Sequence, residues 1–209
     1  MRPASFRLVV CAAVLLGIAH AAAAQDARVG LVPSDTKDPI VGPIFEGIKS
    51  RGGQPLNMHR SVANSPKIFK AYVDMAITLR TAATTPRVDR ELIILRAAQL
   101  AGGEYEFAQH RPMGLSCGLT PAQVDGLENW RKRTDFTERQ RAILGYADGM
   151  AAEKGVDDRT FGELKKHFND QEIVELTVTA AFYGMVSQIT RSLAVKLEPN
   201  AGQTAYGAC

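Results

Sequence analysis

Cysteine is scarce in this sequence: it has 3 cysteines among 209 residues, and no two of them form a C-x-x-C pair. That pair is the common arrangement for thiol–disulfide exchange, and clusters of cysteine are also needed for structural zinc. The sequence has no glycine-rich phosphate loop that ends in Lys-Ser or Lys-Thr either. These absences exclude redox chemistry by neighbouring cysteines, a cysteine-based zinc site and P-loop nucleotide binding.

An excess of charge of one sign is also missing, with 25 Lys and Arg against 22 Asp and Glu and a formal net charge of +3. Arg2 and Arg7 lie in a leading segment in which residues 8–18 are apolar and residues 22–24 are alanine. This pattern predicts a signal peptide over residues 1–24, with an uncleaved membrane anchor as the alternative. Its removal leaves a net charge of +1 (3 minus 2), which argues against nucleic-acid binding. We therefore expect an exported protein, periplasmic or secreted, with no membrane partner after cleavage.

Two cysteines, Cys117 and Cys209, remain after this cleavage. Export to an oxidising compartment permits a disulfide bond between them. The sequence does not show whether the two residues meet in space, because bridging requires their Cα atoms to lie close together. A bridge and two free thiols are therefore both open alternatives.

Strict alternation of apolar and polar residues, the pattern of half-buried strands, is absent as well. Helical periodicity runs through most of the chain instead, and Thr120, Thr137 and Asn169 are expected to cap the starts of helices. Helices are expected over about residues 43–50, 65–82, 86–101, 104–117, 121–130, 137–154, 159–168 and 169–195. The sequence therefore predicts an all-α protein of seven to nine helices, with a flexible arm over 25–38, one helical domain over 39–199 and an irregular tail over 200–209.

Two details of these helices are open to test. The apolar residues Ile68, Tyr72, Met75 and Leu79 recur on one face of the helix expected over 65–82. A proline, Pro112, falls inside the helix expected over 104–117. It should either kink that helix or mark the junction of two short ones, because proline cannot donate a backbone hydrogen bond.

Candidate residues for acid–base chemistry are concentrated in the middle of the chain. Glu91 lies directly before the apolar run 92–95. A carboxylate in such surroundings is costly unless it is paired, and desolvation would raise its pKa, which suits a proton carrier. The alternative is an ion pair with Arg87 or Arg90 near the start of the same helix.

His110 is the second candidate. Glu106 lies one helical turn before it, so the two side chains share a helix face and the carboxylate can orient the imidazole. Alternatively, His110 is a core or interface histidine satisfied by Glu106 or by a backbone carbonyl. Tyr105 and Phe107 could form aromatic walls for an organic substrate or belong to the core. Arg96 could attract an acidic substrate or simply be solvated.

A metal site is a weaker possibility. Glu91, Glu106 and His110 could bind a metal ion as two carboxylates and one histidine. A second histidine would strengthen that case, and none lies near in the sequence. We therefore expect neither a metal nor another cofactor.

The same stretch resembles the carboxymuconolactone decarboxylase-like family, which includes the alkylhydroperoxidase D-like proteins. The resemblance is carried by Arg90-Glu91, residues 92–95, residues 104–110 and Gly118-Leu119-Thr120, and it extends more weakly from about residue 65 to 199. It implies an all-helical fold and assembly into homo-trimers or hexamers. In the peroxidase branch of the family, a glutamate, a C-x-x-C pair and a histidine form a proton relay. Glu91 and His110 match the ends of that relay, but Gly103 and Glu106 stand at the cysteine positions.

The resemblance therefore favours the decarboxylase-like branch, which needs no cysteine pair. It implies a lyase that performs acid–base chemistry, without a cofactor, on a small organic acid or lactone. His110 would be the general acid or base, Glu91 its partner or a second proton carrier, and Glu106 the group that orients His110. The pocket would be lined by Tyr105, Phe107 and Arg96. The expected partners are a small acidic molecule and other copies of the chain. A peroxidase-type antioxidant and a non-catalytic helical binding protein are the alternatives.

Overall fold

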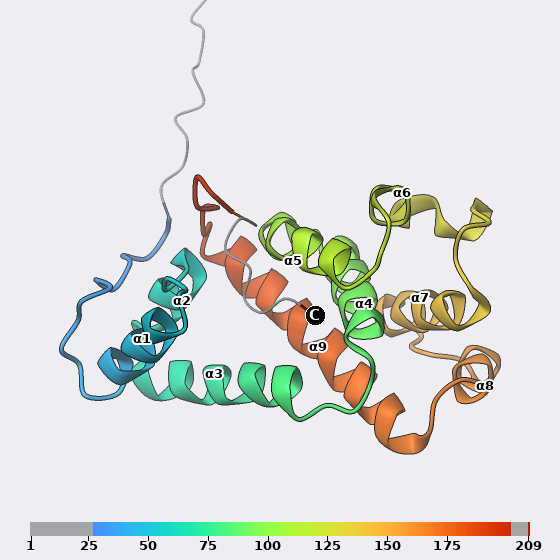
Figure 1. Cartoon of the computed structure of the whole chain (residues 1–209), viewed down its shortest axis with the longest axis horizontal. Helices are drawn as coiled ribbons and strands as arrows, with labels where there is room; N and C mark the ends of the chain where they lie inside the picture. The colour runs from blue at the N-terminus through green and yellow to red at the C-terminus, as the bar shows by residue number, and fades with distance from the viewer. Residues whose placement is uncertain (1–26, 202–208) are drawn as a thin grey trace, which may run out of the picture.

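The computed structural model describes residues 27–201 and residue 209, and within them all regular secondary structure is helical (Figure 1). The helices are α1 Val41–Ser50, α2 Asn57–Val62, α3 Pro66–Thr81, α4 Arg87–Leu100, α5 Glu104–Ser116, α6 Pro121–Asp125, the 3-10 helix η1 Leu127–Lys132, α7 Glu138–Ala151, α8 Asp158–Lys165 and α9 Asp170–Ser192. The all-α prediction is confirmed, although these helices slightly exceed the seven to nine expected. The predicted signal peptide and most of the predicted tail lie outside the described residues.

Several helices begin at the capping residues expected from the sequence. Thr120, Thr137 and Asn169 are the N-caps of α6, α7 and α9, and each side chain accepts a hydrogen bond from the backbone N–H three residues further on. Such caps satisfy backbone donors that a helix leaves unpaired at its start. The segment expected as one helix over 121–130 is instead α6 followed by η1, with Gly126 between them. The short helix α2 was not predicted.

The proline inside α5 does not divide that helix. α5 runs as one α-helix from Glu104 to Ser116 with Pro112 in its interior, so the expectation of two short helices is wrong. The chain leaves the helix at Gly118, whose φ of 108° lies in the left-handed region that glycine adopts at little cost. Because α5 is continuous, Glu106 and His110 share one face of it.

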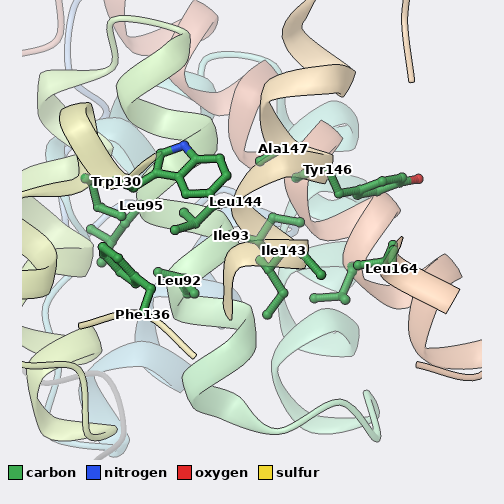
Figure 2. Close-up of a cluster of buried hydrophobic side chains, with 14 of the residues drawn as sticks. Leu92, Ile93, Leu95, Trp130, Phe136, Ile143, Leu144, Tyr146, Ala147 and Leu164 are labelled. Carbon is green, nitrogen blue, oxygen red and sulfur yellow. The ribbon is translucent and has the colours of Figure 1, made fainter. Parts of the chain in front are cut away.

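α4 occupies the centre of the molecule and packs against α5, α7 and α9 (Figure 1). Residues 89–96 of this helix are all buried. Leu92, Ile93 and Leu95 join the main core cluster, which includes residues of η1, α7 and α8 (Figure 2). Ile94 joins a second cluster that contains Met58, Tyr105, Phe182, Tyr183 and Val186. A helix enclosed in this way can keep charged side chains only where each of them has a partner.

α3 is only partly covered by the rest of the protein. Phe69 is its one buried residue. Ile68 and Met75 are 65% and 45% exposed, whereas Tyr72 and Leu79 pack against the second cluster. The four apolar residues that recur on one face in the sequence are therefore divided between the core and the surface.

A disulfide bond joins Cys117, directly after α5, to Cys209 at the end of the chain. The two Cα atoms are 5.0 Å apart, although the residues are separated by 92 positions in the sequence. Of the two alternatives that the sequence left open, the bridge is the one present in the structure.

Removing this disulfide should lower the free energy of unfolding by about 2–4 kcal/mol, because a cross-link between distant residues restricts the unfolded chain. The measurement is urea denaturation of the double variant Cys117→Ala/Cys209→Ala beside the parent. Dithiothreitol should destabilise the parent and leave the variant unchanged. Equal stability of the two proteins without a reductant would contradict this prediction.

Candidate active site

Glu91 has a fully buried side chain in the middle of the molecule. Its Oε1 accepts a hydrogen bond from Nε of Arg87 at 2.6 Å and forms an ion pair with Nη2 of the same guanidinium at 2.5 Å. Its Oε2 lies 2.8 Å from Nδ1 of His110 on α5. Glu91 thus links α4 to α5, and both of its oxygens are paired, as a buried carboxylate requires.

His110 and Arg87 keep the carboxyl group of Glu91 ionised. Burial acts to raise its pKa, but the charges of His110 and Arg87 and their hydrogen bonds outweigh burial and hold the pKa below its usual value. The rise in pKa that desolvation alone would cause is therefore not found, and the alternative of an ion pair with Arg87 is confirmed. As an anion, Glu91 accepts the Nδ1 hydrogen of His110, which leaves Nε2 as the reactive nitrogen.

His110 is enclosed between α4, α5 and α9. Tyr183 of α9 packs edge-on against the imidazole, with ring centroids 4.6 Å apart and an interplanar angle of 78°. Nε2 of His110 lies 3.9 Å from Oε2 of Glu106, which is beyond hydrogen-bond distance. Glu91, rather than Glu106 as expected, is therefore the group whose contact orients the imidazole. Glu106 faces the nitrogen that Glu91 leaves free.

Glu106 is a buried carboxyl group without a firm partner. The residue is 4% exposed, and its Oε1 makes no hydrogen bond to any other described residue. Burial raises the pKa of Glu106 to about 7, against the charge of His110 and with that of Glu198. A carboxyl group that titrates near pH 7 can release and take back a proton under physiological conditions.

Glu198, in the segment after α9, lies beside this cluster. Its Oε1 accepts hydrogen bonds from the hydroxyl of Tyr105 at 2.8 Å and from the backbone N–H of Asn57 at 2.5 Å. Its Oε2 accepts one from Nε2 of Gln109 at 2.6 Å. Tyr105, expected in the pocket, is thus next to Glu106 but directs its hydroxyl to Glu198. The segment 197–199 looks typical of the family, but the sequence assigns Glu198 no role, because its partners come from distant parts of the chain.

Two residues expected to line the pocket lie elsewhere. Arg96 forms an ion pair with Asp148 of α7 at 2.7 Å and donates to the backbone carbonyl of Leu127 at 3.1 Å. Phe107 packs against the main core cluster. These placements correct both expectations. Residues five positions apart on a helix point in different directions, so Arg96 does not follow Glu91 towards α5.

The stretch that carries Glu91, Glu106 and His110 is also the stretch that is similar to known proteins. Residues 66–149 match the carboxymuconolactone decarboxylase family. This match supports membership of the carboxymuconolactone decarboxylase-like superfamily, and alkylhydroperoxidase AhpD-like proteins share the fold. Among curated proteins, none matches the sequence significantly.

Solved structures show the same fold. A protein of unknown function from Agrobacterium tumefaciens, described as a candidate antioxidant defence protein AhpD, is 28% identical with a TM-score of 0.61, over 66% of this chain and 94% of its own. A peroxidase-related protein with an AhpD core from Ralstonia eutropha JMP134 is 18% identical with a TM-score of 0.73, over 88% and 98% of the two chains. The debrominase Bmp8, in complex with 2,3,4-tribromopyrrole, is 18% identical with a TM-score of 0.70, over 85% and 96%. The last two comparisons concern the fold alone.

This carboxymuconolactone decarboxylase-like chain is built without the sulfur pair of the peroxidase branch. A Cβ atom added to Gly103 would collide with Cβ and Oγ of Ser187 on α9. A cysteine at position 103 therefore does not fit while Ser187 keeps its place. The second cysteine position holds the buried carboxyl of Glu106.

Ser116 is not placed as a serine nucleophile either. Residues 114–118 match the Gly-x-Ser-x-Gly pattern of serine hydrolases. However, Ser116 is the last residue of α5 and its hydroxyl donates to the backbone carbonyl of Met113 at 3.0 Å. In serine hydrolases the serine of this pattern lies at a strand-to-helix turn, whereas Ser116 lies at the end of a helix.

The cluster is also not arranged as a metal site. Within residues 27–201 and 209, no three His, Cys, Asp or Glu side chains are grouped so that they could hold a metal ion. The oxygens of Glu91 are already engaged by Arg87 and His110. What these side chains offer is an oriented imidazole next to a carboxyl group that can titrate.

Proposed function

We propose that this member of the superfamily is an exported lyase that performs acid–base chemistry, either decarboxylation or proton transfer, on a small organic acid or lactone. One observation carries the proposal: an imidazole fixed by Glu91 faces the buried carboxyl of Glu106, whose pKa is about 7. Groups that titrate near the working pH are efficient general acids and bases.

The roles follow from where the protons lie. Glu91 holds the Nδ1 hydrogen of His110, so Nε2 is available as a base and the ring keeps one tautomer. Glu106 is the acid, because burial keeps its carboxyl protonated up to about pH 7. Loss of carbon dioxide leaves the bonding electron pair on the organic fragment, and a proton from Glu106 or from protonated His110 completes the product.

A peroxidase-type antioxidant activity is the second candidate. Two similar structures carry antioxidant or peroxidase-related names, and this chain holds a disulfide. However, Cys117, directly after α5, lies 7 residues beyond His110, which places it about 10 Å away along the helix axis. A thiol so far from the imidazole does not complete a proton relay, so we rank this function below the lyase.

A non-catalytic helical binding protein is the third candidate. It is favoured by the burial of His110, Glu91 and Glu106, which are 4%, 0% and 4% exposed. Access of a substrate to such a cluster requires movement of at least one covering side chain. The same burial is what raises the pKa of Glu106, and a structural carboxyl would be expected to have both oxygens paired. We therefore place the lyase first.

We also propose that the chain acts outside the cytoplasm as a homo-trimer or homo-hexamer. Export rests on the leading segment over residues 1–24, and assembly on the family resemblance. Large apolar side chains at the surface support assembly: Ile68 of α3 is 65% exposed, and Val174 and Met185 of α9 are 61% and 43% exposed. Val174 and Met185 are 11 positions apart, a spacing that places both on one side of α9.

The test of the lyase is release of carbon dioxide by purified residues 25–209 from γ-carboxymuconolactone and a panel of related lactone and keto acids. His110→Ala and Glu91→Gln are assayed in parallel, with and without added metal ions. Release that both variants lack would support the lyase and assign the pair. Release that both retain, or no release from any substrate, would overturn it. Peroxide consumption that thiol alkylation abolishes would then favour the peroxidase alternative.

A further inference from the structure

A small cavity lies beside the acid–base cluster formed by Glu91, Glu106 and His110. It has a volume of about 10 Å³, and its lining includes Arg80, Arg87, Arg90, Thr179 and Tyr183. Arg80 and Arg87 are half-buried and the other three are buried, so the cavity leads inward from the connection between α3 and α4. Two of these residues also contact the cluster, because Arg87 pairs with Glu91 and Tyr183 packs against His110.

One residue that lines the cavity has an unpaired hydroxyl group. Thr179 of α9 is 1% exposed, and its Oγ1 makes no hydrogen bond to another described residue. The hydroxyls of Thr177, Ser187 and Thr190 on the same helix donate to backbone carbonyls. Because an unpaired buried hydroxyl costs free energy, we expect a bound group to supply the partner that the described residues do not provide.

The lining of the cavity is positively charged and contains no Asp or Glu. Arg87 directs Nε and Nη2 to Glu91, and its third nitrogen, Nη1, donates to no other described residue. Arg90 instead supports the fold, because its Nε and Nη1 donate to the backbone carbonyls of residues 85, 79 and 80 and so fix the α3–α4 connection. Arg80 lines the same cavity as Tyr183. Burial raises the pKa of Tyr183 to about 12, and the charge of Arg80 opposes this rise.

We propose that this cavity is the subsite for a carboxylate of an organic-acid substrate. One carboxylate oxygen would accept hydrogen bonds from Oγ1 of Thr179 and Nη1 of Arg87, close to the charge of Arg80. The inference rests on the proposed function, because it places the anionic end of the substrate one side chain away from His110. A volume of about 10 Å³ admits one oxygen-sized group, which fits a carboxylate oxygen better than a tetrahedral phosphate. Charge-assisted hydrogen bonds from a guanidinium are the usual means of recognising a carboxylate.

Calorimetric titration with acetate tests this subsite without any turnover, and acetamide serves as the uncharged isostere. Acetate should bind and acetamide should not. Thr179→Val removes the hydroxyl at nearly constant volume and should weaken acetate binding about tenfold. It should also keep or raise the Tm, because it removes an unpaired buried hydroxyl, so weaker binding cannot be ascribed to unfolding.

The matched control is Thr177→Val, the same change two positions earlier on α9. Thr177 is half-buried and does not line the cavity. Its hydroxyl lies 2.8 Å from the hydroxyl of Tyr146 and donates to the backbone carbonyl of Ile173 at 2.6 Å. This variant should therefore leave the affinity for acetate unchanged.

Three results would overturn the subsite: equal binding of acetate and acetamide, tighter binding of inorganic phosphate than of acetate, or an unchanged acetate affinity in Thr179→Val. The two proposals can fail separately. Acetate binding that Thr179→Val weakens, in a protein that releases no carbon dioxide, supports the subsite without the lyase. Carbon dioxide release with the same KM in Thr179→Val and the parent supports the lyase and removes the subsite.

Discussion

Replacing His110 with glutamine should lower turnover by about 10²–10⁴-fold with little change in KM. The amide of glutamine can donate a hydrogen bond to Oε2 of Glu91, which lies 2.8 Å from Nδ1 in the parent, so the buried carboxylate keeps a partner. The amide cannot take up and release a proton near neutral pH. Because the lost interaction belongs to the transition state, kcat and kcat/KM should fall together in steady-state assays of the lyase.

The matched control for this variant is His59→Gln. Burial lowers the pKa of His59 to about 4, and the charge of Arg80 acts in the same direction, so this imidazole is neutral at pH 7. Its Nδ1 accepts a hydrogen bond from the backbone N–H of Leu56 at 3.2 Å, a structural role at the start of α2. The control should lower the Tm and keep the turnover of the parent. A similar loss of turnover in both variants would show that His110 supports the fold and not the chemistry.

Features that depend on a few neighbouring residues could be predicted from the sequence, and features that depend on distant segments could not. The N-caps Thr120, Thr137 and Asn169 act on backbone three residues away, so the starts of their helices are correct. The spacing of Ile68 and Met75 also indicates one apolar face. Periodicity, however, shows only that a face of a helix is apolar. Which residues of that face are buried depends on segments that lie elsewhere in the sequence.

The candidate site shows the same division. Glu91 and His110 could be named from the resemblance to a family, and the structure places them in contact. The direction of the Glu91 pKa could not be predicted, because it depends on whether Arg87 and His110 both reach the carboxylate. Glu198 belongs to a segment 92 positions after Glu106 (198 minus 106), so no local pattern connects them. Arg96 was expected to bind an acidic substrate because the sequence does not show its ion pair with Asp148 of α7.

The free energy of unfolding of Glu106→Gln, relative to that of the parent, should increase as the pH rises. In the parent, burial raises the pKa of Glu106 from 4.5 to about 7. The folded state therefore holds this proton more tightly than the unfolded state does. The resulting stabilisation is complete below about pH 4.5 and is lost as the pH rises through 7. One pKa unit corresponds to about 1.4 kcal/mol, so the parent should lose about 3 kcal/mol. Glutamine has nearly the same shape and does not titrate, so the variant should escape that loss.

Urea denaturation of both proteins at about pH 5 and about pH 8.5 measures this difference in the free energy of unfolding. Glu104→Gln is the control, since Glu104 is an exposed carboxylate on the same helix. Its stability relative to the parent should change by less than about 0.5 kcal/mol between the two pH values. A Glu106→Gln curve that runs parallel to the parent curve would contradict the raised pKa of the buried carboxyl.

The activity of the same variant decides what this carboxyl is for. If Glu106 is the acid, turnover of the parent should fall as the pH rises through about 7, and Glu106→Gln should lose turnover while it gains stability above neutral pH. Ionisation of Glu106 near pH 7 lowers the stability of the folded protein, so this carboxyl does not serve packing. Natural sequences keep such destabilising groups where function requires them. A variant that is more stable and equally active would leave His110 as the sole proton carrier.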